Sequence, residues 1–189
     1  MHLLSILALI PTAFSLAVPQ SILPTGETVK QDIINIHNAV LALDATVQAY
    51  DGSLFPTSLV DGIPVLQGIA KIHKVNRAGF RHALAALPFS VSDSNDVITA
   101  VTDTVNISIP AATAHLKEKL PAFRQSLLIP VVIASLTLLL SDHDTFSVAT
   151  LAKVSPGVGE AKIQEGSDGV ANIHHAIQDA ILFYTLNVV

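Results

Sequence analysis

The sequence predicts an all-α protein, an antiparallel helical bundle of about five long helices plus one short helix. Apolar residues recur three or four positions apart near both ends of the chain, which is the spacing of one helix face. An uncharged apolar run occupies residues 127–140, and no stretch alternates as a strand would. With 189 residues, the chain is long enough for one domain with a packed core.

Residues 1–17 are typical of a secretory signal peptide. The apolar run Leu3–Ile10 is followed by a break at Pro11 and by small residues at Ser15 and Ala17, so we expect cleavage after Ala17. The mature protein is then expected to be secreted. Because no Lys or Arg precedes the run, a buried N-terminal helix stays open as the alternative.

Residues 18–27 should form an extended lead-in, which leaves 28–189 as a single helical-bundle domain. Thr25 or Thr28 can cap the first helix, and Asp51-Gly52 should end it. The apolar positions of this helix alternate steps of four and three: Val29, Ile33, Ile36, Val40, Leu43, Val47 and Tyr50.

A second helix is predicted from about Pro56–Ser58 to Leu87, with Pro88 stopping it. One side of it carries four cations at helical spacing, and no acid lies between Gly62 and Ser92. This basic stripe consists of Lys71, Lys74, Arg77 and Arg81. It is either an ordinary solvated face or a contact for an anion or a polysaccharide.

The segment Ser92–Asp96 offers several capping side chains for a third helix, which Pro110 is expected to kink. The segment lacks the Gly and Glu that a calcium-binding EF-hand loop needs at its sixth and twelfth positions. We therefore interpret these acids as helix caps.

The apolar run 127–140 predicts a buried fourth helix, ended by Ser141-Asp142 and surrounded by other helices because it is apolar on all sides. Its fourteen residues are fewer than the roughly 20 that cross a bilayer, so no transmembrane segment is expected. A short helix, Thr145–Lys153, should follow. The last helix should begin between Gly157 and Ser167.

No pattern predicts catalysis, so we expect a protein that is not an enzyme and uses no cofactor or metal. The chain has no cysteine, no Gly-x-Ser-x-Gly elbow and no His-Glu-x-x-His motif. Adjacent helical residues such as His174 and His175 point about 100° apart, which is poor geometry for one metal. A net charge of −5 gives no reason to expect nucleic acid as a partner. Asn106 begins the one glycosylation sequon.

If the helices do not close completely, the apolar interior becomes a lipid cavity between helices one, two, four and five. The predicted lipid-binding residues are the inward apolar positions Ile36, Val40, Leu66, Ile69, Phe80, Leu84, Ile133, Leu136, Leu140, Ile177 and Ile181. Candidates for a polar anchor of the ligand head are Gln67, Ser135 and Thr137. Small hydroxyls in a helix usually bond back to its own carbonyls, and this reading stays open for Ser135 and Thr137.

The first helix also resembles the opening helix of a known family. The matching residues are Asp32, Ile36, Val40, Leu43-Asp44, Val47, Tyr50 and Gly52, and the last helix adds Ala180-Ile181 and Tyr184. This pattern, over about residues 25–186, is similar to the fungal hydrophobic surface binding protein A family, also called cell wall galactomannoproteins.

The resemblance implies a secreted or cell-wall helical domain that adsorbs to hydrophobic surfaces or encloses fatty acids and other lipids. It does not imply catalysis. Wall-anchored relatives carry a Ser/Thr-rich tail, whereas this sequence stops at Val189 after its last helix, so a freely secreted form is expected. The alternative is a structural cell-wall mannoprotein with a filled core and no ligand.

Overall fold

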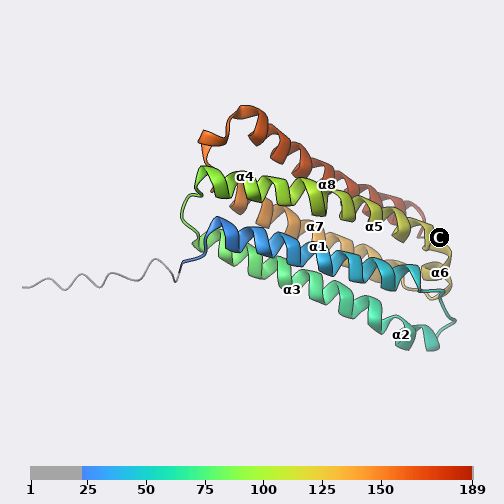
Figure 1. Ribbon diagram of the computed structural model, residues 1–189. Coiled ribbons are helices and arrows are strands. Elements are labelled where there is room, and N and C mark those ends of the chain that lie inside the picture. The colour runs from blue at the N-terminus through green and yellow to red at the C-terminus, as the bar shows by residue number, and fades with distance from the viewer. Residues whose placement is uncertain (1–22, 189) are drawn as a thin grey trace, which may run out of the picture.

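The computed structural model describes residues 23–188 and confirms the predicted all-α bundle (Figure 1). Its helices are α1 Gly26–Gln48, α2 Thr57–Asp61, α3 Ile63–Ala85, α4 Val91–Ala100, α5 Asn106–Glu118, α6 Leu120–Gln125, α7 Ile129–Leu151 and α8 Glu160–Leu186. Across residues 23–188 there is no strand. The predicted signal peptide lies outside the described residues.

Helix α1 packs against α3, α4 and α5. Thr25 caps it, since the Thr25 hydroxyl accepts the backbone N–H of Thr28 at 3.4 Å and the Thr28 hydroxyl accepts that of Thr25 at 3.2 Å. Of the seven predicted apolar positions, six are buried and Leu43 is partly buried against the core. The periodicity therefore identified the inward face of this helix correctly.

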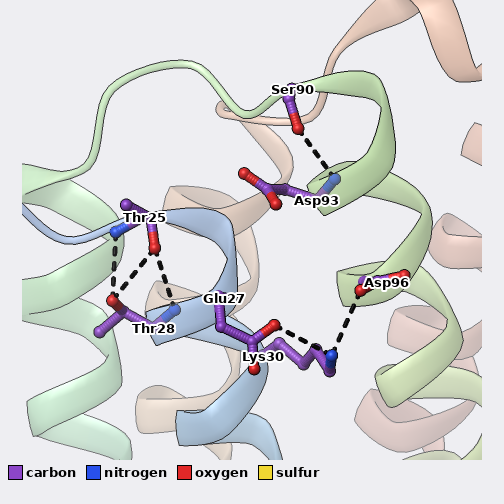
Figure 2. A network of polar contacts seen from close by, with 7 residues as sticks. All are labelled: Thr25, Glu27, Thr28, Lys30, Ser90, Asp93 and Asp96. Atoms are coloured by element: carbon purple, nitrogen blue, oxygen red, sulfur yellow. Dashed lines mark hydrogen bonds and ion pairs between the residues drawn. The ribbon is translucent and has the colours of Figure 1, made fainter.

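An ion-pair bridge ties the start of α1 to α4 (Figure 2). The Lys30 ammonium lies 3.0 Å from the Glu27 carboxylate, one turn away on α1, and 3.2 Å from the Asp96 carboxylate on α4. These side chains are solvent-exposed enough that the pairs contribute little stability.

Helix α4 begins at Val91, slightly earlier than predicted, because Ser90 rather than the segment Ser92–Asp96 supplies its cap. The Ser90 hydroxyl accepts the backbone N–H of Asp93 at 3.0 Å (Figure 2). A π-helical turn, Val101–Val105, joins α4 to α5, so one continuous helical rod runs from 91 to 118.

The predicted second helix is in fact two helices, α2 and α3, which meet at Gly62. Gly62 ends α2 and precedes α3, and a Cβ at this position would lie 3.0 Å from the Leu128 side chain. Pro64 is accommodated in the first turn of α3, where a backbone N–H has no intrahelical partner.

The predicted end of the fourth helix at Ser141-Asp142 is wrong, as is the separate helix Thr145–Lys153. Helix α7 continues unbroken to Leu151. Asp142 does not terminate the helix; its carboxylate is buried and lies 2.6 Å from Nδ1 of His73 on α3. A partner on another helix thus converts an expected stop signal into an interior contact.

The expectation that α7 is surrounded on all sides is also wrong. Helix α7 packs mainly on α3 and α8 and leaves Val131, Leu138 and Val148 exposed on its third side. Among the described residues it is the one helix long and apolar enough to cross a membrane. In this fold it serves as a helix of the bundle, since its other faces contribute to the core.

An aromatic cluster packs where the segment that follows α1 meets α6 and α8. The rings of Tyr50 and Phe123 stack with centroids 5.0 Å apart, and Tyr184 meets Phe123 edge-on at 6.3 Å. The Tyr184 hydroxyl donates to the backbone carbonyl of Leu116, and burial raises the pKa of this phenol above its usual range. The cluster joins three helices at one end of the bundle.

Candidate functional site

A long apolar cavity runs through the bundle between α1, α3, α4, α5, α7 and α8. The space in which the centre of a water molecule could sit amounts to about 130 Å³, roughly ten times what one buried water needs. Its apolar walls include Ile33, Ile36, Val40, Leu43, Val47, Ile72, Val97, Ile98, Val101, Val105, Ile109, Leu116, Leu136, Leu139, Phe146, Leu151, Val154, Val170, Ile173 and Ile177.

The cavity is elongated along the helix axes. Its lining positions on α1 run from Ile33 to Val47, a span of about 21 Å at the helical rise of 1.5 Å per residue. On α7 they run from Leu136 to Leu151, a similar span of about 22 Å. The cavity is therefore an elongated tube, which suits a chain-like molecule better than a compact one.

Four of the eleven predicted lipid-binding residues line this cavity, namely Ile36, Val40, Leu136 and Ile177. Five others pack against the core without lining the cavity: Ile69, Phe80, Ile133, Leu140 and Ile181. The remaining two, Leu66 and Leu84, do not face inward, because their side chains are 44% and 56% exposed.

The misplaced residues on α3 have a physical cause. The side of α3 that faces the core carries Val65 and Ile72 in its first half, but only the small or polar residues Asn76, Gly79 and Ala83 in its second half. These small side chains allow α1 and α7 to approach α3 closely. A Cβ on Gly79 would lie 2.9 Å from the Phe146 ring on α7 and 3.2 Å from Asp32 Cβ on α1. A search for large apolar residues cannot find such a face.

The three predicted polar anchors do not line the cavity. Gln67 is exposed on α3, and Ser135 is half-buried on α7. The Thr137 hydroxyl donates to the backbone carbonyl of Ile133 at 2.8 Å, which is the back-bonding alternative.

Six other polar side chains line the cavity, and none of them was predicted as a ligand contact. They are Asp44, Asn76, Thr113, His143, Ser147 and Thr150. Three belong to the second half of α7, where the sequence predicted a break at Ser141-Asp142 and a separate helix from Thr145. The helical spacing of Leu139, His143, Phe146 and Thr150 is the signal that could have revealed them.

Thr150 is the exceptional member of this set. Its side chain is 6% exposed, and its hydroxyl has no hydrogen-bond partner among the described residues. A buried hydroxyl without a partner costs stability, so its presence on a cavity wall is a reason to look for a ligand.

Two neighbouring side chains of α7 form a small polar group with Thr150, because residues three and four apart share a helix face. Nε2 of His143 lies 3.1 Å from the Val170 carbonyl, so this nitrogen carries the proton and donates. Nδ1 is then the acceptor, and the Ser147 hydroxyl lies 3.5 Å from it. Burial lowers the pKa of His143, which keeps the ring neutral.

Asp44 borders the cavity on α1 but is already fully engaged. Its carboxylate lies 3.0 Å from Nδ1 of His115 on α5 and accepts from the Gln48 amide at 2.8 Å. The Thr113 hydroxyl likewise donates to the Pro110 carbonyl at 2.9 Å. These groups are satisfied within the protein and need no ligand.

Histidines elsewhere pair singly with carboxylates on neighbouring helices. His82 lies 2.8 Å from Asp32, and His174 lies 2.8 Å from Asp144. Burial is the larger influence on Asp32 and raises its pKa. No group of three or more possible ligands for a metal ion occurs in the described part of the chain.

The predicted glycosylation site Asn106 lies at the start of α5 and not in a loop. Its amide oxygen accepts a hydrogen bond from the Asn172 amide at 2.7 Å. Glycosylation at this position stays a prediction.

Similar folds occur in solved structures of fungal lipid complexes. The structure of AFMP4P in complex with palmitic acid shares 18% identity at a TM-score of 0.76, covering 84% of this chain and 99% of that one. Ligand binding domain 1 of the Penicillium marneffei MP1 protein, complexed with arachidonic acids, shares 22% identity at a TM-score of 0.73, covering 84% and 98%. Domain 2 of the same protein, complexed with multiple arachidonic acids, shares 17% identity at a TM-score of 0.70, covering 82% and 92%.

No curated protein sequence matches this chain. The sequence profile described as hydrophobic surface binding protein A matches residues 26–152, from the first residue of α1 to just beyond α7. This match spans most of the chain and includes most of the cavity-lining residues, so the chain belongs to the hydrophobic surface binding protein A family.

Proposed function

We propose that this protein is a non-catalytic lipid carrier that binds a long-chain fatty acid in the interhelical cavity. The observation that carries the proposal is the cavity itself, whose lining positions span about 21 Å along α1, with mostly apolar walls and one buried hydroxyl that lacks a partner among the described residues. The solved structures with similar folds hold palmitic and arachidonic acids, which supports the same ligand class here.

The acyl chain supplies most of the binding free energy. Each buried methylene is worth about 0.8 kcal/mol before the costs of association, so partial enclosure of a long chain reaches micromolar affinity. The ligand head is placed at Thr150, whose hydroxyl is free to donate to a carboxyl oxygen. Gln67, Ser135 and Thr137 have no part in this arrangement.

The same protein is proposed to adsorb to hydrophobic surfaces, in keeping with its family. Two adjoining segments, the α1–α2 connection with α2 and the α6–α7 turn, expose large apolar side chains. The segments are held together by the Ser53 backbone N–H, which donates to the Ser126 hydroxyl at 3.2 Å. The exposed side chains are Leu54, Phe55, Leu59, Val60 and Leu127.

Titration of delipidated protein with saturated fatty acids of increasing chain length tests the cavity. Affinity should climb with length until the tube is filled. Leu136→Trp occupies the cavity without adding charge and should abolish binding, whereas Leu138→Trp, on the exposed side of the same helix, should leave binding intact. If the affinity depended neither on chain length nor on Leu136→Trp, a structural cell-wall protein with a filled core would be the better interpretation.

Secretion is the second part of the proposal and rests on the signal-like residues 1–17. N-terminal sequencing of protein from the culture medium should begin at Val18, and enzymatic deglycosylation should remove a glycan from Asn106. A protein that stays in the cell with Met1 retained would contradict this localisation.

A further inference from the structure

Helix α3 lies at the edge of the bundle (Figure 1). It packs mainly on α1 and α7, and it makes only a small contact with the short helix α2. Its outward side is therefore a continuous solvent-facing surface along all 23 residues of the helix.

The basic stripe occupies this outward side. Of the ten Lys and Arg residues, six have a polar partner: Lys30, Lys117, Lys119 and Lys162 pair with carboxylates, and Lys153 and Arg124 donate to backbone carbonyls. Within residues 23–188, the other four have neither an ion pair nor a hydrogen bond, and all four lie on α3. They are Lys71, Lys74, Arg77 and Arg81.

The acids of α1 and α7, the two helices on which α3 mainly packs, form no ion pair with the stripe, because each pairs with another residue. On α1, Glu27 pairs with Lys30, and Asp32 and Asp44 pair with histidines. On α7, Asp142 and Asp144 do the same. A chain of net charge −5 thus keeps four cations that form no ion pair together on one helix.

Exposed apolar side chains lie in line with these cations. Eighteen residues make five helical turns, so Leu84 lies directly along the helix axis from Leu66, and Arg81 lies directly along it from Ile63. Ile63, Leu66 and Leu84 are all about half exposed. Near the middle of the helix, Arg77 stacks on the Phe80 ring at 4.5 Å, which fixes one cation at the surface.

We propose that this face of α3 docks the protein onto a lipid surface with anionic headgroups. The cations would meet the headgroup phosphates or carboxylates while the leucines and isoleucine enter the boundary with the acyl chains, as in amphipathic helices that lie in a membrane interface. An acidic polysaccharide would use the charges but would leave the aligned apolar residues without a role, so the combined pattern favours lipid. The docking does not depend on a ligand in the cavity, and it is tested without one.

Vesicle co-sedimentation tests the docking, with neutral phosphatidylcholine vesicles compared with vesicles that also contain phosphatidylglycerol. The protein should prefer the anionic vesicles, and raising the salt to about 0.5 M should remove the preference. Each surface cation contributes about a fivefold factor, so replacing Lys71, Lys74, Arg77 and Arg81 by Gln should lower partitioning roughly a hundredfold or more. Leu66→Ser with Leu84→Ser should lower it several-fold with the charge unchanged.

A charge-matched control removes Lys117, Lys119, Arg124 and Lys162 instead, and it should bind anionic vesicles like the parent protein. All variants should keep the parent's helical circular dichroism spectrum. If the protein bound both kinds of vesicle equally and the α3 substitutions did not change this binding, adsorption would be assigned to another face and the proposal would be overturned. Charge-dependent binding of soluble alginate without binding of vesicles would also overturn the proposal, and it would assign the stripe to polysaccharide. Failure to bind either vesicles or alginate would overturn it as well.

Discussion

Removal of the Thr150 hydroxyl is expected to change protein stability and ligand binding in opposite directions. Thr150→Val keeps the shape of the side chain and removes a buried hydroxyl that has no partner. Relief of that cost should raise the unfolding free energy of the delipidated protein by about 1 kcal/mol, and the same change should weaken fatty-acid binding. Chemical denaturation and ligand titration measure the two effects.

Thr113→Val is the matched control, because Thr113 also lines the cavity but its hydroxyl donates to the Pro110 carbonyl. This variant should lose about 1 kcal/mol of stability. If Thr150→Val destabilised the delipidated protein as Thr113→Val does, the Thr150 hydroxyl would have a partner after all, and its assignment as the ligand contact would fail.

His143 should make the fold sensitive to mild acid. Burial lowers its pKa in the folded protein below the ordinary value of 6.5, so the folded state favours the neutral ring. The stability this provides is present above pH 6.5 and is lost as the pH falls through the lowered pKa. His143→Gln should remove this component, so melting temperatures of the parent should fall more steeply than those of the variant below pH 6.5.

The exposed His175 offers the control, because His175→Gln should leave the steep fall of the parent unchanged. Parallel melting curves for the parent and His143→Gln over this range would show that the ring at position 143 is as easily protonated in the fold as in the unfolded chain. The separate influence of Asp32, whose pKa is raised, belongs to more acidic conditions near and above its ordinary value of 3.8.

Periodicity predicted the helices well where the core face is apolar and poorly where the core face is polar or small. The first helix was located together with its cap and its inward residues, because large apolar side chains mark that face. On α7 the second half was assigned to a separate helix, because Asp142 looks like a terminator until His73, 69 positions away in sequence, supplies its partner. On α3 the inward face carries Asn76, Gly79 and Ala83, so the larger exposed leucines were chosen instead.

The close approach of α3 to α7 sets the width of the cavity at Phe146. Gly79→Ala would place a Cβ 2.9 Å from the Phe146 ring, which itself lines the cavity. The gain in helix propensity is about 1 kcal/mol, whereas overpacking of a tight contact costs about 1–3 kcal/mol. We expect a net loss of about 1 kcal/mol in unfolding free energy and weaker binding of long fatty acids, measured by denaturation and titration.

Gly169→Ala is the comparison for Gly79→Ala. Gly169 lies in the middle of α8, and a Cβ there would make an ordinary contact with the Val101 side chain at 3.4 Å. It should stabilise the protein by up to about 1 kcal/mol through helix propensity alone. A Gly79→Ala variant that gained stability in the same way would mean that Phe146 moves aside freely and that this contact does not set the cavity width.

At the scale of the whole molecule, the bundle could be predicted because its class depends on helix periodicity and brief turns. The existence of a cavity could be predicted from the sequence, but the set of residues that line it could not. Its walls come from six helices whose relative rotation depends on contacts such as the Gly26–Asp93 approach, where a Cβ would lie 2.3 Å from the aspartate Cβ. No local pattern in the sequence encodes the rotation of one helix against another.

Ligand binding should raise the stability of the whole bundle in proportion to the length of chain enclosed. A fatty acid present at about 100 times its dissociation constant adds about 2.7 kcal/mol, which for a protein of this size raises the melting temperature by roughly 5–10 °C. The shift should grow with chain length and then level off once the tube is filled. Differential scanning fluorimetry of delipidated protein with a chain-length series measures it.

A variant at one end of the tube makes this prediction specific. Leu151 lines the cavity near the end of α7, so Leu151→Trp should shorten the tube and move the levelling-off to shorter fatty acids. Leu138→Trp adds the same ring outside the cavity and should leave the levelling-off point where it is in the parent. A thermal shift that is equal for short and long acids, or a levelling-off point that Leu151→Trp does not move, would place the lipid on the surface of the bundle and not along the axis of the cavity.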